Sequence, residues 1–261
     1  VASLSGGQKQ RVTCAYHLLL KGYKVEVFEA QRKAGGMALV GIPQYRLPKD
    51  ILLAEANTIE QLGGKFHYGR RLGKDFTLDD LFNEGFNAVF IGVGCAKGMK
   101  LGFPEDNEQI EGYYNGLDFL LQVERGVVEG EAPSFSGDFV VVGGGNVAMD
   151  VARSAVRCGA EKVSIVYRRR ICDMTAQDAE IAGAQAEGCE VLELTAPLAI
   201  ETGEDGRVSG LRVQPQIIGE PRRGRPAPRA AATPERVIPC ERVFVAIGQD
   251  IDSKPFEDMG I

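Results

Sequence analysis

The feature that most constrains the fold of this chain is a glycine-rich turn between an apolar run and a helix-forming run. The strand-like run Phe139–Val142 leads directly into Gly143-Gly144-Gly145-Asn146-Val147-Ala148, which reads G-x-G-x-x-A. In such a turn the first glycine permits a tight bend, the second lets the backbone approach a pyrophosphate, and the small last residue lets the helix pack closely on the strand. The helix N-terminus then presents free N–H groups to the phosphates. We predict a dinucleotide-binding βαβ unit, the alternative being a purely structural turn.

The nucleotide preference is predicted by the residues that end the second strand of this unit. That strand, predicted over 162–167, is followed by Arg168-Arg169-Arg170. A site for NAD usually has an acidic residue here, which binds the ribose 2′-hydroxyl. Arginines instead suit a 2′-phosphate, because they make charge-assisted and bidentate contacts. We therefore expect NADP, with Arg168 and Arg169 as ligands; the alternative is an ordinary solvated basic turn.

Strand-like and helix-like runs alternate along the chain, which predicts an α/β protein with doubly wound parallel sheets. Ala88–Val93 is nearly all apolar and is predicted to be a buried parallel strand. Residues 190–213 predict an antiparallel excursion with a turn at Gly203–Gly206, and Gly219–Pro234, rich in Pro, Arg and Ala, predicts an exposed loop. The other expected helices are 12–20, 50–62, 78–82, 117–123, 146–158 and 176–187, and the other strands are 23–29, 139–142, 162–167 and 242–247.

The N-terminal region has the flanks of a second dinucleotide-binding unit, but its turn is altered. Glu29 ends the second strand 22 residues after Gly7, where a carboxylate can accept a hydrogen bond from a ribose hydroxyl. The turn reads Ser5-Gly6-Gly7-Gln8-Lys9-Gln10 and keeps one glycine in three when the motif is overlaid on Ser5, Gly7 and Gln10. Gln10 at the close-packing position would push the helix off the strand, so the first turn is predicted to be degenerate.

The same stretch, Leu4–Arg11 (LSGGQKQR), looks like the signature string of ABC-transporter ATPases. An ATPase of that family also needs G-x-x-x-x-G-K-[ST] to cradle phosphates, and an apolar strand that ends in Asp-Glu for the metal and the water. Neither pattern occurs in the 261 residues. We therefore do not expect an ATPase.

Composition excludes several classes of protein. The formal net charge is −6, which argues against a broad nucleic-acid or anionic-membrane surface. No apolar run is long enough to span a bilayer, and no secretory signal is visible. The six cysteines include no C-x-x-C pair, so neither a zinc nor an iron–sulfur site is expected. We expect the cysteines to be buried free thiols in a reducing cytoplasm. The 33 glycines show no repeat, so each must act at its own backbone position.

Further strings along the chain match a known family. They are Phe28–Ala30, Gly35-Gly36-Met37, the string GIPQYRLP at Gly41–Pro48, Ala88–Gly94, Gly143–Arg153, Val166–Arg169 and Ala246-Ile247-Gly248-Gln249. On these residues the chain resembles the glutamate synthase small-subunit-like flavoprotein oxidoreductases, which include the NADPH–flavin module of dihydropyrimidine dehydrogenase. The resemblance runs from about Thr13 to the end.

The resemblance implies two Rossmann-like domains, with the NADP domain inserted into the flavin domain. The implied limits are 1–110 for an FAD-type domain, 111–243 for the NADP domain and 244–261 for the return segment. It also implies hydride transfer from NADPH to FAD, and electron transfer onward to an iron–sulfur partner subunit or domain. Such hydride transfer needs stacking and orientation more than a protein acid or base, so no catalytic dyad is expected.

The resemblance also implies residue roles. Gly143, Gly144, Gly145, Asn146 and Val147, with Arg168 and Arg169, would hold NADPH. In the flavin domain Glu29 would hold the FAD ribose, and Gly35 and Gly36 would lie along the FAD pyrophosphate. Met37 and Arg46 would approach the flavin. Gly248 would sit where the chain returns to the flavin domain. Without the family, Gly35-Gly36 is a plain turn. The altered first turn and the early end at Ile261 leave a second function open, a non-catalytic NADP-binding module without FAD.

Overall fold

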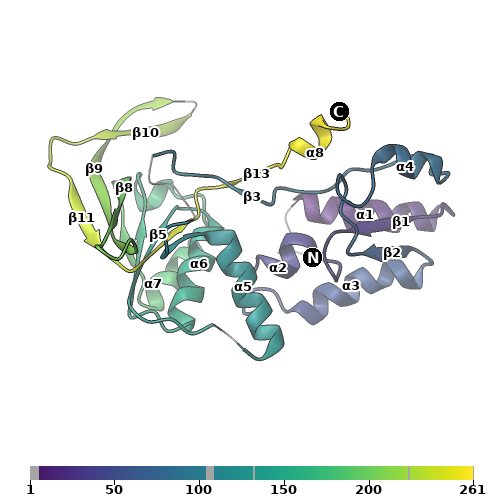
Figure 1. The fold of residues 1–261 in the computed structure, drawn as a ribbon, viewed down its shortest axis with the longest axis horizontal. Helices are drawn as coiled ribbons and strands as arrows, with labels where there is room; N and C mark the ends of the chain where they lie inside the picture. The colour runs from purple at the N-terminus through teal and green to yellow at the C-terminus, as the bar shows by residue number, and fades with distance from the viewer. Residues whose placement is uncertain (1–5, 104–108, 132, 223, 261) are drawn as a thin grey trace. The chain divides into compact units, whose positions relative to one another are not determined.

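The structure is a computed structural model that describes residues 6–103, 109–131, 133–222 and 224–260 (Figure 1). The chain forms two compact units: unit 1 comprises Val1–Lys97 and Asp250–Ile261, and unit 2 comprises Gly98–Gln249. The chain enters unit 2 within β3 (Lys97–Gly98) and leaves it within β13 (Gln249–Asp250). The domain limits predicted from the sequence, after residues 110 and 243, both lie inside unit 2.

Unit 2 is built on a five-stranded parallel sheet with the order β4-β12-β5-β6-β7. Its strands are β4 (Tyr113–Asn115), β5 (Asp138–Val142), β6 (Lys162–Val166), β7 (Glu190–Leu192) and β12 (Arg242–Val245). Val142 at the end of β5 is in register with Val166 on one side and Val245 on the other. The carboxyl ends of the three central strands therefore lie at the same level, at one edge of the sheet. The expected α/β class with parallel sheets is confirmed.

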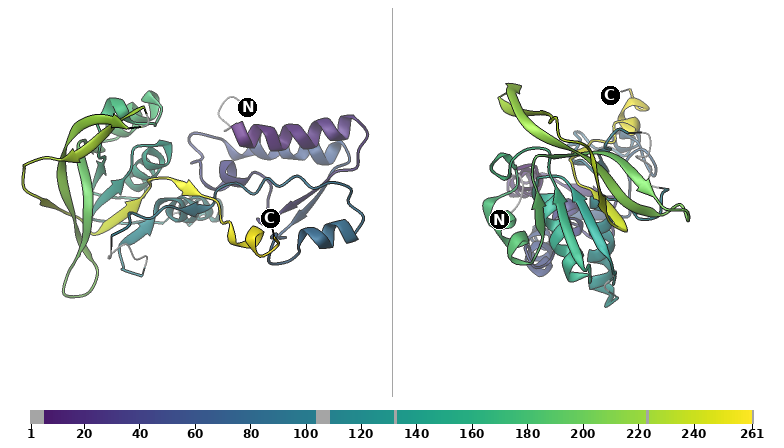
Figure 2. Two further views of the ribbon diagram at one scale, coloured as in Figure 1. Left: turned by 90° about the horizontal axis from the view of Figure 1, so that it is seen from above. Right: turned by 90° about the vertical axis from the view of Figure 1, so that its left-hand side faces the viewer.

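The two faces of this sheet are covered by different layers (Figure 2). On one face Phe139, Val141 and Ile165 are buried against three helices, α5 (Gly116–Glu129), α6 (Asn146–Arg157) and α7 (Asp178–Ala186). Because both faces of a parallel sheet are covered, its strands read as continuous apolar runs. The helices predicted at 146–158 and 176–187 are confirmed to within two residues at each end, and α5 extends well beyond the predicted 117–123.

The other face is covered by an antiparallel sheet in which β9 (Val208–Arg222) pairs with all three other strands. These are β8 (Thr195–Thr202), β10 (Arg225–Ala230) and β11 (Arg236–Pro239). Leu211 and Val213 of β9 are fully buried in the cluster that contains Val140 and Val142. The predicted turn at Gly203–Gly206 is confirmed, since it joins β8 to β9.

The loop predicted at Gly219–Pro234 is wrong, because much of this segment is a β-hairpin. Residues up to Arg222 extend β9, and β10 pairs back on it with Ala227 opposite Gly219. Proline is excluded from central strands but is compatible with an edge strand, whose outer N–H groups need no partner. Among the described strands β10 pairs with β9 alone, which explains how Pro226 and Pro228 fit a strand although the composition of the segment is typical of a loop.

Unit 1 contains a parallel pair of short strands, β1 (Glu26–Glu29) and β2 (Lys65–Tyr68). Its helices are α1 (Gly6–Leu20), α2 (Gly36–Val40), α3 (Lys49–Gln61), α4 (Leu78–Asn83) and α8 (Lys254–Glu257). α3 confirms the helix predicted at 50–62 and α4 that at 78–82, whereas β1 is shorter than the predicted strand at 23–29. The first glycine turn is predicted to be degenerate, and from Gly6 onward the structure has a helix in its place, because Gly6 and Gly7 begin α1; Ser5 lies outside the described residues.

The strand predicted at Ala88–Val93 is also wrong. These residues carry no regular secondary structure, and the side chains of Phe90 and Val93 are 64% and 53% exposed. A parallel strand exists only where a neighbouring backbone edge supplies hydrogen bonds, and among the described residues β1 pairs only with β2. Nothing in the local sequence reveals that such an edge is lacking. No described helix has the length and apolar character required to cross a bilayer.

Candidate functional site

The glycine turn lies where β5 ends and α6 begins, as the sequence predicts. Gly143 has φ +150°, and a Cβ added to it would collide with the carbonyl oxygen of Ala246, which follows the neighbouring strand β12. Ala148 is fully buried, so the helix packs closely on the sheet. The first glycine and the small sixth residue of the motif therefore serve packing between adjacent elements.

Gly145 has a different environment from Gly143. A Cβ added to it would meet only the Oγ1 of Thr175, at 3.5 Å, which is ordinary contact. Gly145 is the N-cap residue of α6, and no described side chain caps this helix. Asn146 and Val147 at the start of α6 line a cavity together with Gly145, at the positive end of the helix dipole, where anions bind readily.

A short segment after β6, residues 175–177, forms hydrogen bonds with the glycine turn. The carbonyl oxygen of Gly144 accepts hydrogen bonds from the backbone N–H groups of Thr175 and Ala176, at 3.0 and 3.1 Å. The side-chain oxygen of Asn146 accepts another from the N–H of Gln177, at 2.9 Å. These bonds hold the turn in a conformation prepared before any ligand arrives.

The three arginines that follow β6 have three different environments. Arg170 forms an ion pair with Asp173, with Nε–Oδ2 and Nη2–Oδ1 distances of 2.8 and 3.0 Å, and this pairing lowers the pKa of the Asp173 carboxyl. Arg169 is half-buried and donates from Nε to the carbonyl oxygen of Pro226 at 2.7 Å. Arg168 is exposed and has no hydrogen-bond or ion-pair partner among the described residues. Arg168 is therefore the arginine most available to an incoming anion.

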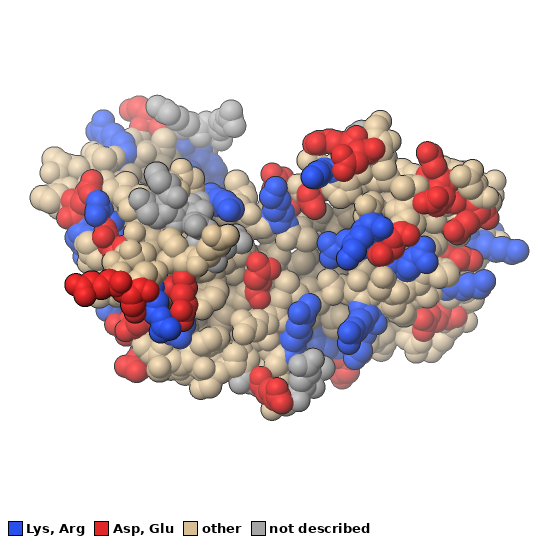
Figure 3. Space-filling model, in the orientation of Figure 1, with Lys and Arg blue, Asp and Glu red and all other residues tan. Residues whose placement is uncertain are grey.

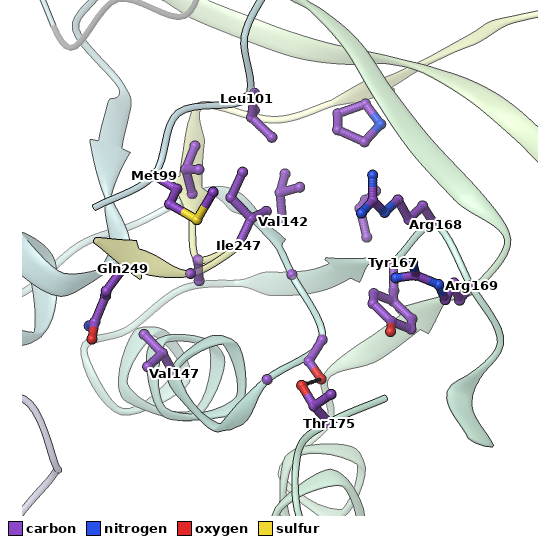
Figure 4. Close-up of a pocket in the computed structure, with 18 of the residues that line it drawn as sticks. Met99, Leu101, Val142, Val147, Tyr167, Arg168, Arg169, Thr175, Ile247 and Gln249 are labelled. Atoms are coloured by element: carbon purple, nitrogen blue, oxygen red, sulfur yellow. Dashed lines mark hydrogen bonds between the residues drawn. The ribbon is translucent and has the colours of Figure 1, made fainter. Parts of the chain in front are cut away.

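The glycine turn, Thr175, Arg168 and Arg169 line one cavity of about 590 Å³ in unit 2, and Arg170 does not (Figure 4). It opens at the carboxyl ends of β12, β5 and β6, the position where ligands bind in open α/β sheets. Figure 4 shows Arg168 and Arg169 at one end of the cavity and Met99, Ile247 and Gln249 at the other. Its volume lies within the range usual for small-molecule and cofactor sites, roughly 300–1,000 Å³.

The seven residues predicted to hold NADPH all line this cavity: Gly143, Gly144, Gly145, Asn146, Val147, Arg168 and Arg169. Gly248, predicted where the chain returns to the flavin domain, lies in unit 2 and lines this cavity instead. Sequence reasoning missed Met99, Asn115, Thr175 and Arg225. Met99 and Asn115 precede the motif and belong to no recognisable pattern. Arg225 had a signal, the run of arginines at 222–225, but that run lay in a segment expected to be a loop.

A second cavity, of about 540 Å³, lies within unit 1 and is lined by three more of the predicted residues, Glu29, Gly36 and Met37. Glu29 Oε1 accepts a hydrogen bond from the backbone N–H of Gln31 at 2.8 Å. Gly35 and Arg46, which were predicted for the same site, do not line this cavity, whereas Arg70 and Arg71 do. An arginine pair near an acidic residue suits a ligand that carries both phosphate and hydroxyl groups.

The cysteines and other potential metal ligands form no centre in the described part of the chain. No three His, Cys, Asp or Glu side chains there lie close enough to hold a metal ion, and all six thiols are free. Cys158, Cys189 and Cys240 are buried as expected, but Cys172 is exposed, so the expectation of burial is wrong for that residue. It lies in the 3₁₀ turn Ile171–Asp173, which projects from the end of β6.

Comparison with known proteins gives the wider context of the two cavities. Residues 12–261 match the pyridine nucleotide-disulphide oxidoreductase family. The chain is 40% identical over 254 residues to the NADP(+)-dependent formate dehydrogenase subunit beta of Moorella thermoacetica, covering 96% of this chain and 35% of that protein. It is 34% identical over 254 residues to the glutamate synthase [NADPH] small chain of Escherichia coli, covering 94% and 53%.

Among solved structures, FprA of Mycobacterium tuberculosis in complex with NADPH has the same fold, with a TM-score of 0.73 at 18% identity, covering 94% of this chain and 69% of that one. The chain thus spans between about a third and a half of the length of the two curated relatives. The family match over nearly the whole chain confirms the resemblance drawn from the motifs. The chain belongs to the pyridine nucleotide-disulphide oxidoreductase family, with glutamate synthase small chains among its relatives.

Proposed function

We propose that unit 2 binds NADPH, and that the chain is the NADPH-binding part of a flavoprotein oxidoreductase similar to the glutamate synthase small chain. The observation that carries the proposal is the convergence of two features on one cavity. Gly145 and the start of α6, which no described side chain caps, face it from the end of β5, and Arg168, which has no partner among the described residues, faces it from the end of β6. One feature suits a pyrophosphate and the other a 2′-phosphate.

The cavity fits the parts of the cofactor in order. The pyrophosphate would lie against the amides of Gly145, Asn146 and Val147. The 2′-phosphate would lie at the arginine end, and the nicotinamide at the apolar end near Met99 and Ile247 (Figure 4). On the face shown in Figure 3, basic and acidic side chains are interspersed, which matches a small-molecule site better than a nucleic-acid surface.

The test of the nucleotide preference is the pair of dissociation constants for NADPH and NADH. We expect NADPH to bind more tightly, and Arg168→Ala to weaken NADPH by about 1.5–3 kcal/mol while leaving NADH almost unchanged, because only NADPH carries the phosphate. Lys162→Ala is the matched control, since it removes one positive charge from the opposite end of β6, where Lys162 pairs with Glu190. Equal affinities of the unmodified protein for the two nucleotides would contradict the proposal.

We also propose that unit 1 holds FAD, which when bound supplies the group that accepts a hydride. Glu29 at the end of β1 would accept hydrogen bonds from the ribose, and Gly36 at the start of α2 would let a phosphate approach; both line the unit 1 cavity with Met37. Gly35 does not line this cavity, and its place along the pyrophosphate stays a prediction; a Cβ on it would lie 2.7 Å from that of Leu39, so packing requires a glycine here. Arg46 stays a prediction without a place in the cavity.

One observation favours the second candidate, an NADP-binding module without flavin: Gly6 and Gly7 lie in α1 rather than in a glycine turn. The absorption spectrum separates the two. We expect the purified protein, or the protein after addition of FAD and removal of excess, to absorb near about 450 nm, where oxidised flavins absorb. Glu29→Ala should lower the amount of flavin retained. A colourless protein that binds NADPH supports the second candidate instead.

We further propose an iron–sulfur partner subunit as the electron acceptor, and a cytoplasmic location. Support for the partner comes from the relatives, one of which is named a subunit beta and the other a small chain. Support for the location comes from the six free thiols, which persist in reducing compartments. Affinity purification from the cytoplasmic fraction of the native cell tests both proposals. We expect the chain in this fraction together with a co-purifying protein that contains iron and acid-labile sulfide. Absence of that protein would contradict the proposed partner, and absence of the chain from this fraction would contradict the proposed location.

A further inference from the structure

The hairpin of β9 and β10 brings a residue from a distant part of the sequence to the proposed NADPH cavity. Arg225 begins β10, directly after the turn that joins the two strands, and it lines the cavity together with Arg168 and Arg169. It is exposed, as Arg168 is. Its neighbours in space are thus the arginines at the end of β6, although more than fifty residues separate them along the chain.

Two hydrogen bonds attach the start of β10 to the segment after β6. Arg169 Nε donates to the carbonyl oxygen of Pro226 at 2.7 Å, and Arg225 Nη2 donates to the carbonyl oxygen of Asp173 at 3.3 Å. The same Asp173 oxygen accepts from the hydroxyl of the buried Tyr167 at 2.9 Å. These bonds fix the position of the hairpin relative to Arg168–Arg170. Among the described residues they engage only one N–H of the Arg225 guanidinium.

The charges at this end of the cavity do not balance among the described residues. Arg170 is neutralised by Asp173. Arg168, Arg169 and Arg225 have no described carboxylate within ion-pair distance, and each guanidinium retains N–H groups that are not engaged. Three guanidinium groups that line one cavity suit a ligand group with about two negative charges and several acceptor oxygens, which describes a phosphate monoester.

We propose that Arg225 is a third arginine of the 2′-phosphate subsite, and that the β9–β10 hairpin is therefore part of the machinery that selects NADPH over NADH. This inference rests on the proposed binding of NADPH in unit 2. Arg225 contacts the 2′-phosphate directly, and Arg169 has two functions, since its Nε holds the hairpin while its remaining N–H groups face the same phosphate.

The test uses two ligands that differ only in this group, 2′,5′-ADP and 5′-AMP, with the full chain and dissociation constants from calorimetry. Arg225→Ala should weaken 2′,5′-ADP about tenfold and change 5′-AMP by less than about twofold. Arg225→Lys keeps the charge but loses the fork of donors, so it should lie between the alanine variant and the unmodified protein. Arg229→Ala is the control, because Arg229 is exposed on the same strand but does not line the cavity.

The outcomes separate the role of Arg225 from the nucleotide preference of unit 2. If the unmodified protein binds the two ligands equally, the proposed function of unit 2 fails. If it prefers 2′,5′-ADP and Arg225→Ala keeps that preference, the proposed function stands and the role of Arg225 is overturned; the same holds if both ligands weaken equally. Unchanged thermal unfolding of the variants without ligand shows that the fold is intact, and Arg225→Lys supplies the answer if the alanine variant does not fold.

Discussion

At the scale of single residues, the glycine motif combines two unrelated demands. Gly143 is required by the protein itself, since the space beside it is filled by the carbonyl group of Ala246. Gly145 is not required for packing, since the space beside it is open and faces the cavity. A motif read as one signature therefore divides into a residue that stabilises the fold and a residue that admits the ligand.

A matched pair of alanine substitutions tests this division. Gly143→Ala should lower the free energy of unfolding by about 2 kcal/mol or more, because the new methyl group meets a backbone oxygen and the residue has positive φ. Gly145→Ala should change it by less than about 0.5 kcal/mol. Gly145→Ala should nevertheless weaken NADPH binding, because its methyl group occupies the approach to the α6 amides. Denaturant unfolding and calorimetry measure both; equal stability losses would contradict the division.

The buried thiols give a pH dependence with a definite sign. Burial raises the pKa of Cys240 to about 12 and that of Cys189 to about 11, from an ordinary 9.0. The unfolded chain therefore ionises at lower pH than the folded one, so this contribution to stability is complete below about pH 9 and is lost as the pH rises toward those values.

Alkylation followed by mass spectrometry measures the accessibility and thiolate character of each cysteine. At about pH 8 the exposed Cys172 should react first, and Cys158, Cys189 and Cys240 should react only when the protein unfolds, since the thiolate is the reacting species. Rapid labelling of Cys240 in the folded protein would contradict the burial that raises its pKa.

At the scale of elements, two apolar segments of similar composition have different structures. β5 lies between β6 and β12, and its apolar side chains, Phe139 to Val142, are almost completely buried. Residues 88–93 carry the same kind of side chains but have no neighbouring strand among the described residues. Apolar composition alone therefore does not make a strand, because the backbone also needs hydrogen-bond partners.

Hydrogen exchange should report this difference directly. The amides of Phe90, Ile91 and Val93 should exchange much faster than those of Val140, Val141 and Val142, because only the latter are bonded within a sheet. Exchange at neutral pH, followed by proteolysis and mass spectrometry, gives both rates in one experiment. Comparable protection of the two segments would show that residues 88–93 are paired in solution.

At the scale of the whole molecule, the chain consists of two units, and the second is continuous in sequence. Every residue that lines the proposed NADPH cavity belongs to unit 2, and so do both core clusters that enclose its parallel sheet. Unit 1 is discontinuous, and its core cluster of Ala38, Leu47 and Leu52 is far smaller. Stability and nucleotide binding should therefore depend mainly on unit 2.

A fragment of residues 98–249 tests this expectation. It should fold cooperatively, because a domain with its own core can fold alone. It should also bind 2′,5′-ADP within a factor of about three of the full chain, since no lining residue is removed. Circular dichroism, thermal unfolding and calorimetry provide the measurements. An unfolded fragment would show that the stability of unit 2 depends on unit 1. A folded fragment that does not bind would show that unit 1 contributes to the site.

The sequence by itself determined the turn at Gly143, the helix that follows it and the arginines at the end of β6. All three belong to one βαβ unit, whose strands and helix follow from local periodicity and whose ligand positions follow from the local order of residues. The distance between Gly145 and Arg168 along the chain is short enough for that local geometry to place both at one edge of the sheet.

Only the tertiary structure decided the rest of the cavity. Met99 and Arg225 reach it from separate segments, and no periodicity within either segment encodes which distant surface it will face. The prolines of β10 and residues 88–93, which form no strand, were misjudged for a related reason, since a strand depends on whether another backbone lies beside it. Local pattern determines what a segment is able to form, whereas long-range pairing determines what it does form and what it contacts.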